Sequence, residues 1–138
     1  MGVGVVVHDH TGCFLAACGE SHEVVTPEIA EALTVRRALS FAQEEGWPKI
    51  IMASDCLSVI QRIRSGGIDR SLCGPVIEDI KLLSMSFTSC VFCHVNRVLN
   101  VAAHLLARGC ESVVSSVWRY VFFFLRVCVA LCCSGLYP

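Results

Sequence analysis

The chain has 138 residues and a mass of 15.0 kDa, and 54% of its residues are hydrophobic. This is the size of one ordinary domain with enough apolar material for a substantial core. The chain contains 11 Lys and Arg residues and 12 Asp and Glu residues, so its net charge is −1. This charge excludes a basic field over the whole molecule that would attract polyanions. Any contact with nucleic acid therefore has to be local.

Cysteine is unusually frequent, with 10 residues. In a secreted chain this number would indicate a disulfide framework, but the first residues, MGVGVVVHDH, contain no basic leader, no long apolar core and no small-residue cleavage site. We therefore expect reduced thiols and an intracellular protein, in the cytoplasm or nucleus, without a signal peptide.

The first predicted element is a β-hairpin. Val3 to His8 is rich in β-branched residues, residues 9–12 (DHTG) supply the chemistry of a turn, and Cys13 to Cys18 is apolar again. Two such runs joined by Asp and Gly are typical of antiparallel strands.

A helix is predicted next. Thr26 suits the N-cap, Pro27 the first helical position, and Glu28 the first turn. Apolar residues follow at helical spacing, and Gly46 is a natural end for the helix.

The rest of the domain alternates between strands and helices. The order is strand, helix, helix, strand and helix, over Lys49–Ser54, Leu57–Ile63, Pro75–Met85, Ser89–Val95 and Asn100–Arg108. A hairpin followed by such an alternation predicts an α/β fold.

The composition changes near Glu111, so we predict a domain over residues 1–110 and a hydrophobic C-terminal tail over residues 111–138. Only two charges, Arg119 and Arg126, lie between Val117 and Pro138. An Arg near the centre of a span of about 20 residues costs roughly 2.5–3.5 kcal/mol on insertion scales. We do not expect the tail to span a membrane, and a buried or aggregation-prone β segment fits its composition at least as well.

Four segments carry a resemblance to a known family: GVGVVVHDHTG, TPEIAEALTVRRAL, KIIMASDCLSVIQ and HVNRVLNVAAHLLAR. In this order and spacing they resemble plant ribonuclease H-like domains, of the reverse-transcriptase-like, RNase H type 1 kind, over roughly Met1 to Cys110. The resemblance implies an α/β fold with a mixed sheet and flanking helices. It also implies Mg²⁺-dependent endonucleolytic cleavage of RNA in RNA–DNA hybrids, with a hybrid or RNA as partner and no small-molecule cofactor.

The resemblance assigns the catalytic residues. It places the family's helical Glu at Glu31 and the Asp that follows the next strand at Asp55, both as metal ligands. The position on the last helix is His104, where many relatives carry Asp, and His94 matches a histidine that assists proton transfer or product release. Clustered carboxylates are needed because two Mg²⁺ ions about 3.5–4 Å apart require hard oxygen ligands.

Contacts with nucleic acid are expected nearby. Arg97 and Asn100 flank the same predicted loop and are candidates to touch phosphate and sugar oxygens. Arg62, Arg64 and Arg70 form a second small basic group around Gly66-Gly67. Phosphate contacts of this kind provide affinity without reading the base sequence.

Each of these residues also has a purely structural interpretation. Asp55 is placed to cap the following helix, and a helical Glu such as Glu31 is usually solvated, with Glu28 as the substitute ligand. His94 is equally consistent with a hydrogen-bonded residue at a strand end. Cys90, Cys93 and His94 have the spacing of half a zinc site, but no second pair follows at a matching distance.

One part of the family pattern is missing. The family's first acid lies on a central strand that precedes the GVGVVV segment, whereas this sequence begins at Met1-Gly2-Val3-Gly4. The chain is therefore expected to be N-terminally truncated and to lack this strand, through a truncated gene model or degeneration, unless the tail segment YVFFFLRVCVAL replaces it. Two functions remain open, a weakened hybrid nuclease and a catalytically inactive nucleic-acid-binding or remnant domain. No feature indicates an oligomeric state.

Overall fold

The computed structural model describes residues 2–9, 14–21, 23, 26–96, 116–119 and 125–132. Its strands are β1 (Gly2–Asp9), β2 (Phe14–Ser21), β3 (Lys49–Ser54), β4 (Ser89–His94), β5 (Ser116–Arg119) and β6 (Leu125–Cys132). Its helices are α1 (Pro27–Glu44), α2 (Leu57–Arg64) and α3 (Gly74–Ser84).

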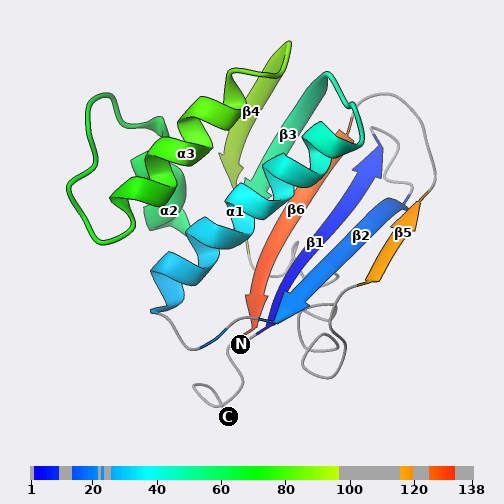
Figure 1. Cartoon of the computed structure of the whole chain (residues 1–138), viewed down its shortest axis with the longest axis horizontal. Helices are drawn as coiled ribbons and strands as arrows, with labels where there is room; N and C mark the ends of the chain where they lie inside the picture. The colour runs from blue at the N-terminus through cyan, green and yellow to red at the C-terminus, as the bar shows by residue number, and fades with distance from the viewer. Residues whose placement is uncertain are drawn as a thin grey trace.

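The strands form one mixed sheet of six strands in the order β4-β3-β6-β1-β2-β5 (Figure 1). β3 pairs in parallel with β4 and with β6, whereas β6 pairs antiparallel with β1. β1, β2 and β5 continue the sheet as antiparallel neighbours. The carboxyl ends of β3, β4 and β6 therefore lie at the same edge of the sheet, beside the start of β1.

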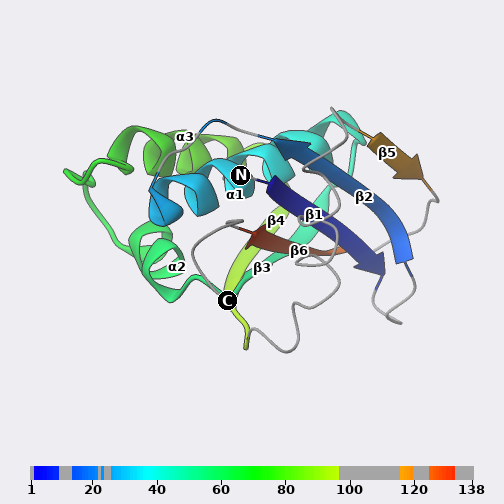
Figure 2. The same ribbon diagram turned by 90° about the horizontal axis from the view of Figure 1, so that it is seen from below.

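The helices cover one face of this sheet. Figure 1 shows α1 crossing diagonally in front of the strands with α3 beside it, and the view from below separates the helices α1 and α3 from the strands β1 and β2 (Figure 2). The side chains between the two layers are fully buried and apolar, the largest being Phe41, Leu39, Ile50, Met52, Ile60, Ile77 and Ile80. Burial of this surface is the main favourable term that holds the helices on the sheet.

Most predicted elements are confirmed, with shifts of one or a few residues at their ends. α1 begins as expected, because the side chain of the N-cap Thr26 accepts a hydrogen bond from Ile29 N and Pro27 occupies the first turn. Gly46, with φ of 74°, follows the helix where an L residue would be strained. The helix predicted over Asn100–Arg108 lies outside the described residues.

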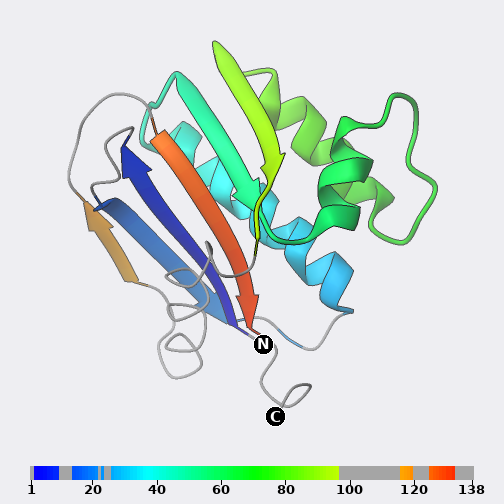
Figure 3. The same cartoon turned by 180° about the vertical axis from the view of Figure 1, so that it is seen from behind.

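Replacement of the missing central strand by the tail segment, one of the alternatives that the sequence left open, is the arrangement observed, and the central position of the sheet is filled. It is occupied by β6, which comes from the hydrophobic tail and pairs along its length with β1 on one side and with β3 on the other. Its sequence, LRVCVALC, suits a strand with neighbours on both sides. Viewed from behind, β6 runs beside β3 and points the same way (Figure 3). Across the described part of the chain, no helix is both long and apolar enough to cross a membrane.

Candidate functional site

Glu31 is a buried carboxylate in the first half of α1, with only 3% of its surface exposed. Ser54 Oγ, at the end of β3, donates a hydrogen bond to Glu31 Oε1. A buried charged group is costly unless hydrogen bonds compensate for the lost water. The interpretation of Glu31 as an ordinary solvated residue is therefore wrong, and its carboxylate lies under the carboxyl end of β3.

The turn after β3 is organised by the same serine. Cys56 N donates to Ser54 Oγ at 3.1 Å, so that one hydroxyl connects the turn to Glu31. Asp55, half-buried, lies between these two residues. The N-cap of α2 is Cys56, without a side-chain hydrogen bond, so Asp55 is not in the capping position that was the structural alternative for it.

His94 joins the same edge from β4. It is the ladder partner of Ser54, and its ring Nε2 lies 3.2 Å from the backbone carbonyl oxygen of Asp55. The imidazole is exposed and donates this hydrogen bond when Nε2 carries the proton. The resemblance predicts that Glu31 and Asp55 converge with His104, which lies outside the described residues. Ser54 connects Glu31 to the turn that carries Asp55, and His94 contacts the backbone carbonyl of Asp55.

The surroundings of Cys56 at this edge of the sheet raise the pKa of its thiol. Burial is the main cause that raises its pKa, and the negative charges of Glu31 and Glu28 raise it further. The thiol therefore stays protonated at neutral pH. Cys56, Cys73, Cys90 and Cys93 are free thiols, and burial raises the pKa of Cys90 to about 11.

Glu28, the substitute ligand, is engaged elsewhere. Arg62 Nε donates to Glu28 Oε1 at 2.9 Å, and hydrogen bonds from Arg62 and Ser58 lower the pKa of this carboxyl. Arg62 Nη1 also donates to Asp69 Oδ2 at 3.3 Å. Glu28 is thus part of an ion-pair network that joins α1 to α2 and to the loop before α3.

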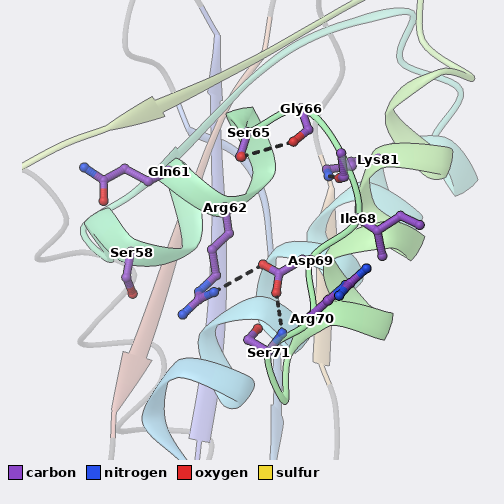
Figure 4. A pocket seen from close by; sticks show the side chains of 11 residues that line it. Ser58, Gln61, Arg62, Ser65, Gly66, Ile68, Asp69, Arg70, Ser71 and Lys81 are labelled. Carbon is purple, nitrogen blue, oxygen red and sulfur yellow. Dashed lines mark hydrogen bonds and ion pairs between the residues drawn. The ribbon is translucent and has the colours of Figure 1, made fainter.

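That loop forms one wall of a pocket of about 450 Å³, here called the loop pocket (Figure 4). Its lining is mostly polar, and in Figure 4 Arg62 and Asp69 point toward each other while Ser71 approaches Asp69 from below. The lining side chains with hydroxyl, amide or charged groups are Ser58, Gln61, Arg62, Ser65, Asp69, Arg70, Ser71 and Lys81. Three cations and one carboxylate line the pocket, and the carboxylates of Glu28 and Glu78 lie directly behind them as ion-pair partners.

The cations of the loop pocket differ in the ion pairs and hydrogen bonds that they form. Arg62 is held by two carboxylates, and Lys81 Nζ donates to Gly67 O at 2.9 Å and to Glu78 Oε1 at 3.0 Å. Arg70 is exposed and has no ion pair with any residue that the structure describes. Arg64, grouped with these residues from sequence, instead donates to the Phe92 carbonyl on β4.

The carboxylates of Glu31 and Asp55 are the ligands that the resemblance assigns to Mg²⁺. Glu31 and Asp55 offer hard oxygen ligands of the kind that hold one Mg²⁺, which keeps several waters. They do not fit a pair of ions, because no group of three or more His, Cys, Asp or Glu side chains is placed to hold a metal ion within the described ranges. Cys90 and Cys93, which have the spacing of half a zinc site, belong to no such group of described side chains.

Some of the predicted site residues lie outside the part of the chain that the structure describes, and other residues of the site were not predicted from the sequence. His104, Arg97 and Asn100 lie outside the described residues. Asp69 was not singled out from the sequence, because its contact with Arg62 spans a loop that local periodicity does not reveal. The only available signal for Ser54 was its position directly before Asp55.

The comparisons with known proteins agree with this architecture. The model of a family described as reverse transcriptase-like matches residues 1–110. No curated protein matches the chain. The structure is similar to RNase H1 from the halophilic archaeon Halobacterium salinarum NRC-1, with a TM-score of 0.74 and 22% identity over 80% of this chain and 84% of that chain.

A second solved structure gives the same result. The N-terminal RNase H domain of Rv2228c from Mycobacterium tuberculosis, solved as a fusion with maltose-binding protein, has a TM-score of 0.70 and 21% identity, over 79% of this chain and 80% of that chain. At these identities the similarity shows the fold. The expected fold class, an α/β ribonuclease H-like mixed sheet with flanking helices, is confirmed.

Proposed function

Because the chain belongs to the reverse transcriptase-like family, we propose that it binds nucleic acid, with RNA–DNA hybrids as its preferred ligand, and cleaves the RNA strand only weakly. The observation that carries this proposal is the hydrogen bond from Ser54 to Glu31, which holds a helical carboxylate beside the residue that precedes Asp55. Two carboxylates at the carboxyl edge of parallel strands lie where α/β folds bind ligands.

In this proposal each residue at the edge has one role. Glu31 and Asp55 hold a single Mg²⁺, which when bound stabilises negative charge on a phosphate oxygen. His94, anchored to the Asp55 carbonyl, moves protons at the edge, and His104, which lies outside the described residues, assists. Arg97 and Asn100 contact phosphate and sugar oxygens, without any small-molecule cofactor.

The loop pocket supports the binding part of the proposal. Arg70 is exposed in the lining of this pocket, which also includes the hydroxyl groups of Ser65 and Ser71, and all three side chains are donors suited to phosphate oxygens. Since the whole chain carries a charge of −1, contact with a polyanion has to be local, and in this proposal the exposed Arg70 supplies such a contact.

The test measures binding of a labelled RNA–DNA hybrid in EDTA over a series of salt concentrations. Arg70→Gln is expected to weaken binding and to reduce the slope of log K against log salt by about 1, as for the loss of one phosphate contact. The control Arg36→Gln makes the same change of charge on α1, at a residue paired with Asp79, and should leave the slope unchanged. Absence of hybrid binding by the native chain at low salt would refute the proposal.

A noncatalytic nucleic-acid-binding domain is the second candidate, favoured because no group of three or more His, Cys, Asp or Glu side chains among the described residues could hold a metal ion. Cleavage of the hybrid in Mg²⁺ separates the two. Weak cleavage that Asp55→Asn abolishes supports the enzyme, and hybrid binding with no cleavage that differs from Asp55→Asn supports the binding domain.

A further inference from the structure

The strand β4 lies at one end of the sheet, and among the described strands it pairs only with β3 (Figure 3). Successive residues of a strand direct their backbone N–H and C=O groups to opposite sides in turn. Val95 N, just after β4, donates to the Ser54 carbonyl on the β3 side. The backbone groups that point to the open edge are therefore those of Cys90, Phe92 and His94.

This edge lacks the features that usually prevent strands from pairing, which are charged side chains, proline or a bulge. The sequence of β4, SCVFCH, contains no Lys, Arg, Asp, Glu or Pro. Val91, on the face of the sheet away from the helices, is 50% exposed, and its ladder partner Ile51 is 44% exposed. An uncharged edge beside exposed apolar side chains is a template for an additional strand.

One side chain from another element lies across this edge. The guanidinium of Arg64, at the end of α2, donates a hydrogen bond to the Phe92 carbonyl. Arg64 is exposed and has no carboxylate partner among the described residues, so this carbonyl is what holds it in place. The bond uses the acceptor of the middle one of the three residues that point outward.

The middle residue is the important one for pairing with a second copy of the chain. Antiparallel pairing of two identical strands places a twofold axis between them. In the register centred on Phe92, each Phe92 N–H donates to the Phe92 carbonyl of the other copy, and Cys90 lies opposite His94 of the other copy. Arg64 occupies the place of the incoming N–H, and the two guanidinium groups, which carry the same charge, would meet near the axis.

We propose that the edge of β4 is a surface for pairing with a second copy of this chain, and that Arg64 keeps this surface closed so that the native chain stays monomeric. The uncharged strand is self-complementary, and Val91 and Ile51 would continue the apolar face of the sheet across the axis. A second strand would also lie beside His94, so the Arg64 contact keeps that end of β4 open. The inference does not depend on the proposed function, and its test uses no nucleic acid.

The test measures the mass of the full-length chain by analytical ultracentrifugation over a range of concentrations. The native chain is expected to stay at 15.0 kDa, whereas Arg64→Ala is expected to shift toward twice this mass as its concentration rises. Amide hydrogen exchange of residues 89–94 should slow in the Arg64→Ala dimer, because the outward N–H groups then donate to the second copy. The control Arg36→Ala removes an exposed Arg from α1 and should keep the mass of one chain.

The double variant that combines Arg64→Ala with Val91→Lys tests the location of the contact. Val91 is half-exposed, so the fold accepts a lysine there, and the added charge at the edge should return the mass to one chain. A native chain with the mass of two chains, or an Arg64→Ala variant that stays at one chain at the highest concentration, would overturn the inference. Assemblies larger than two chains, a dimer without slowed exchange in residues 89–94, or a dimer that Val91→Lys does not dissociate would overturn it as well.

Discussion

At the scale of single residues, Ser54 connects the sheet to the helix layer. Its hydroxyl donates to the buried Glu31 and accepts from Cys56 N, so the carboxylate and the turn that carries Asp55 depend on one side chain. The sequence indicated Glu31 and Asp55 through a family resemblance, whereas this contact joins residues 23 positions apart and has no local pattern. Capping by Thr26 was predictable because it depends on neighbours within one turn.

Replacing Ser54 by Ala is expected to lower the free energy of unfolding by about 1–3 kcal/mol, the cost of removing a hydrogen bond from a buried polar group. Urea unfolding measures this difference. Ser86→Ala is the control, since Ser86 is exposed and its hydroxyl bonds only the Leu83 carbonyl. Equal stability of the two variants would show that the Ser54 hydroxyl does not hold Glu31.

The ion-pair network of Arg62 predicts a pH dependence. Hydrogen bonds from Arg62 and Ser58 lower the pKa of Glu28, and hydrogen bonds from Ser71 and Arg62 lower that of Asp69. Carboxyls with a lowered pKa in the folded state stabilise it above their unfolded pKa values, and this contribution is lost as the pH falls through the folded values.

Arg62→Gln should therefore be less stable than the native chain at neutral pH, and the difference should shrink below the ordinary carboxyl range. Urea unfolding at several pH values measures it. Arg36→Gln removes a single exposed ion pair, with Asp79, and should cost at most about 1 kcal/mol. A difference for Arg62→Gln that is independent of pH would contradict the assignment to these carboxyls.

At the scale of elements, the loop before α3 depends on a glycine for its close packing. A Cβ on Gly74 would lie 2.2 Å from the backbone oxygen of Asp69, whereas a Cβ on Gly66 meets nothing within 4 Å. The clash involves backbone, so the loop must shift if the residue changes. The expected cost of Gly74→Ala is about 1–3 kcal/mol, in the range for overpacking.

Gly66→Ala is the matched control and should be neutral, because its backbone is not in the left-handed region. Thermal unfolding compares the two. Gly74→Ala should also weaken hybrid binding, since Asp69, Arg70 and Ser71 of the loop pocket move with the loop. Two alanine variants of equal stability would mean that the loop accommodates the methyl group without a shift.

The strands β5 and β6 differ in how many neighbours they have. β6 pairs on both sides, whereas β5 lies at the end of the sheet beside β2. A proline cannot donate to the ladder and is tolerated mainly in edge strands. Val127→Pro should therefore abolish cooperative unfolding in urea, and Trp118→Pro should leave a cooperative transition. A cooperative transition in both would argue that β6 is not the central strand.

The sequence offered the tail as one candidate for the central strand but could not decide in its favour. Hydrophobic alternation and turn residues revealed the elements from Val3 to Val95, since each signal is local. The tail showed only β propensity, and nothing in its composition states that its partners are strands near residues 5 and 52. A strand from a distant segment pairs where the other strands leave a gap. The position of that gap depends on the whole sheet and not on local sequence.

At the scale of the whole molecule, β6 makes the order of synthesis differ from the order in the sheet. The strand that joins β1 and β2 to β3 and β4 is the last of the described strands in the chain. During translation the two halves of the sheet remain without their common neighbour until Cys132 has left the ribosome exit tunnel. Their unpaired edges are then exposed to other chains, and contacts of such long sequence separation form slowly. The nascent chain should consequently depend on chaperones until β6 has left the exit tunnel.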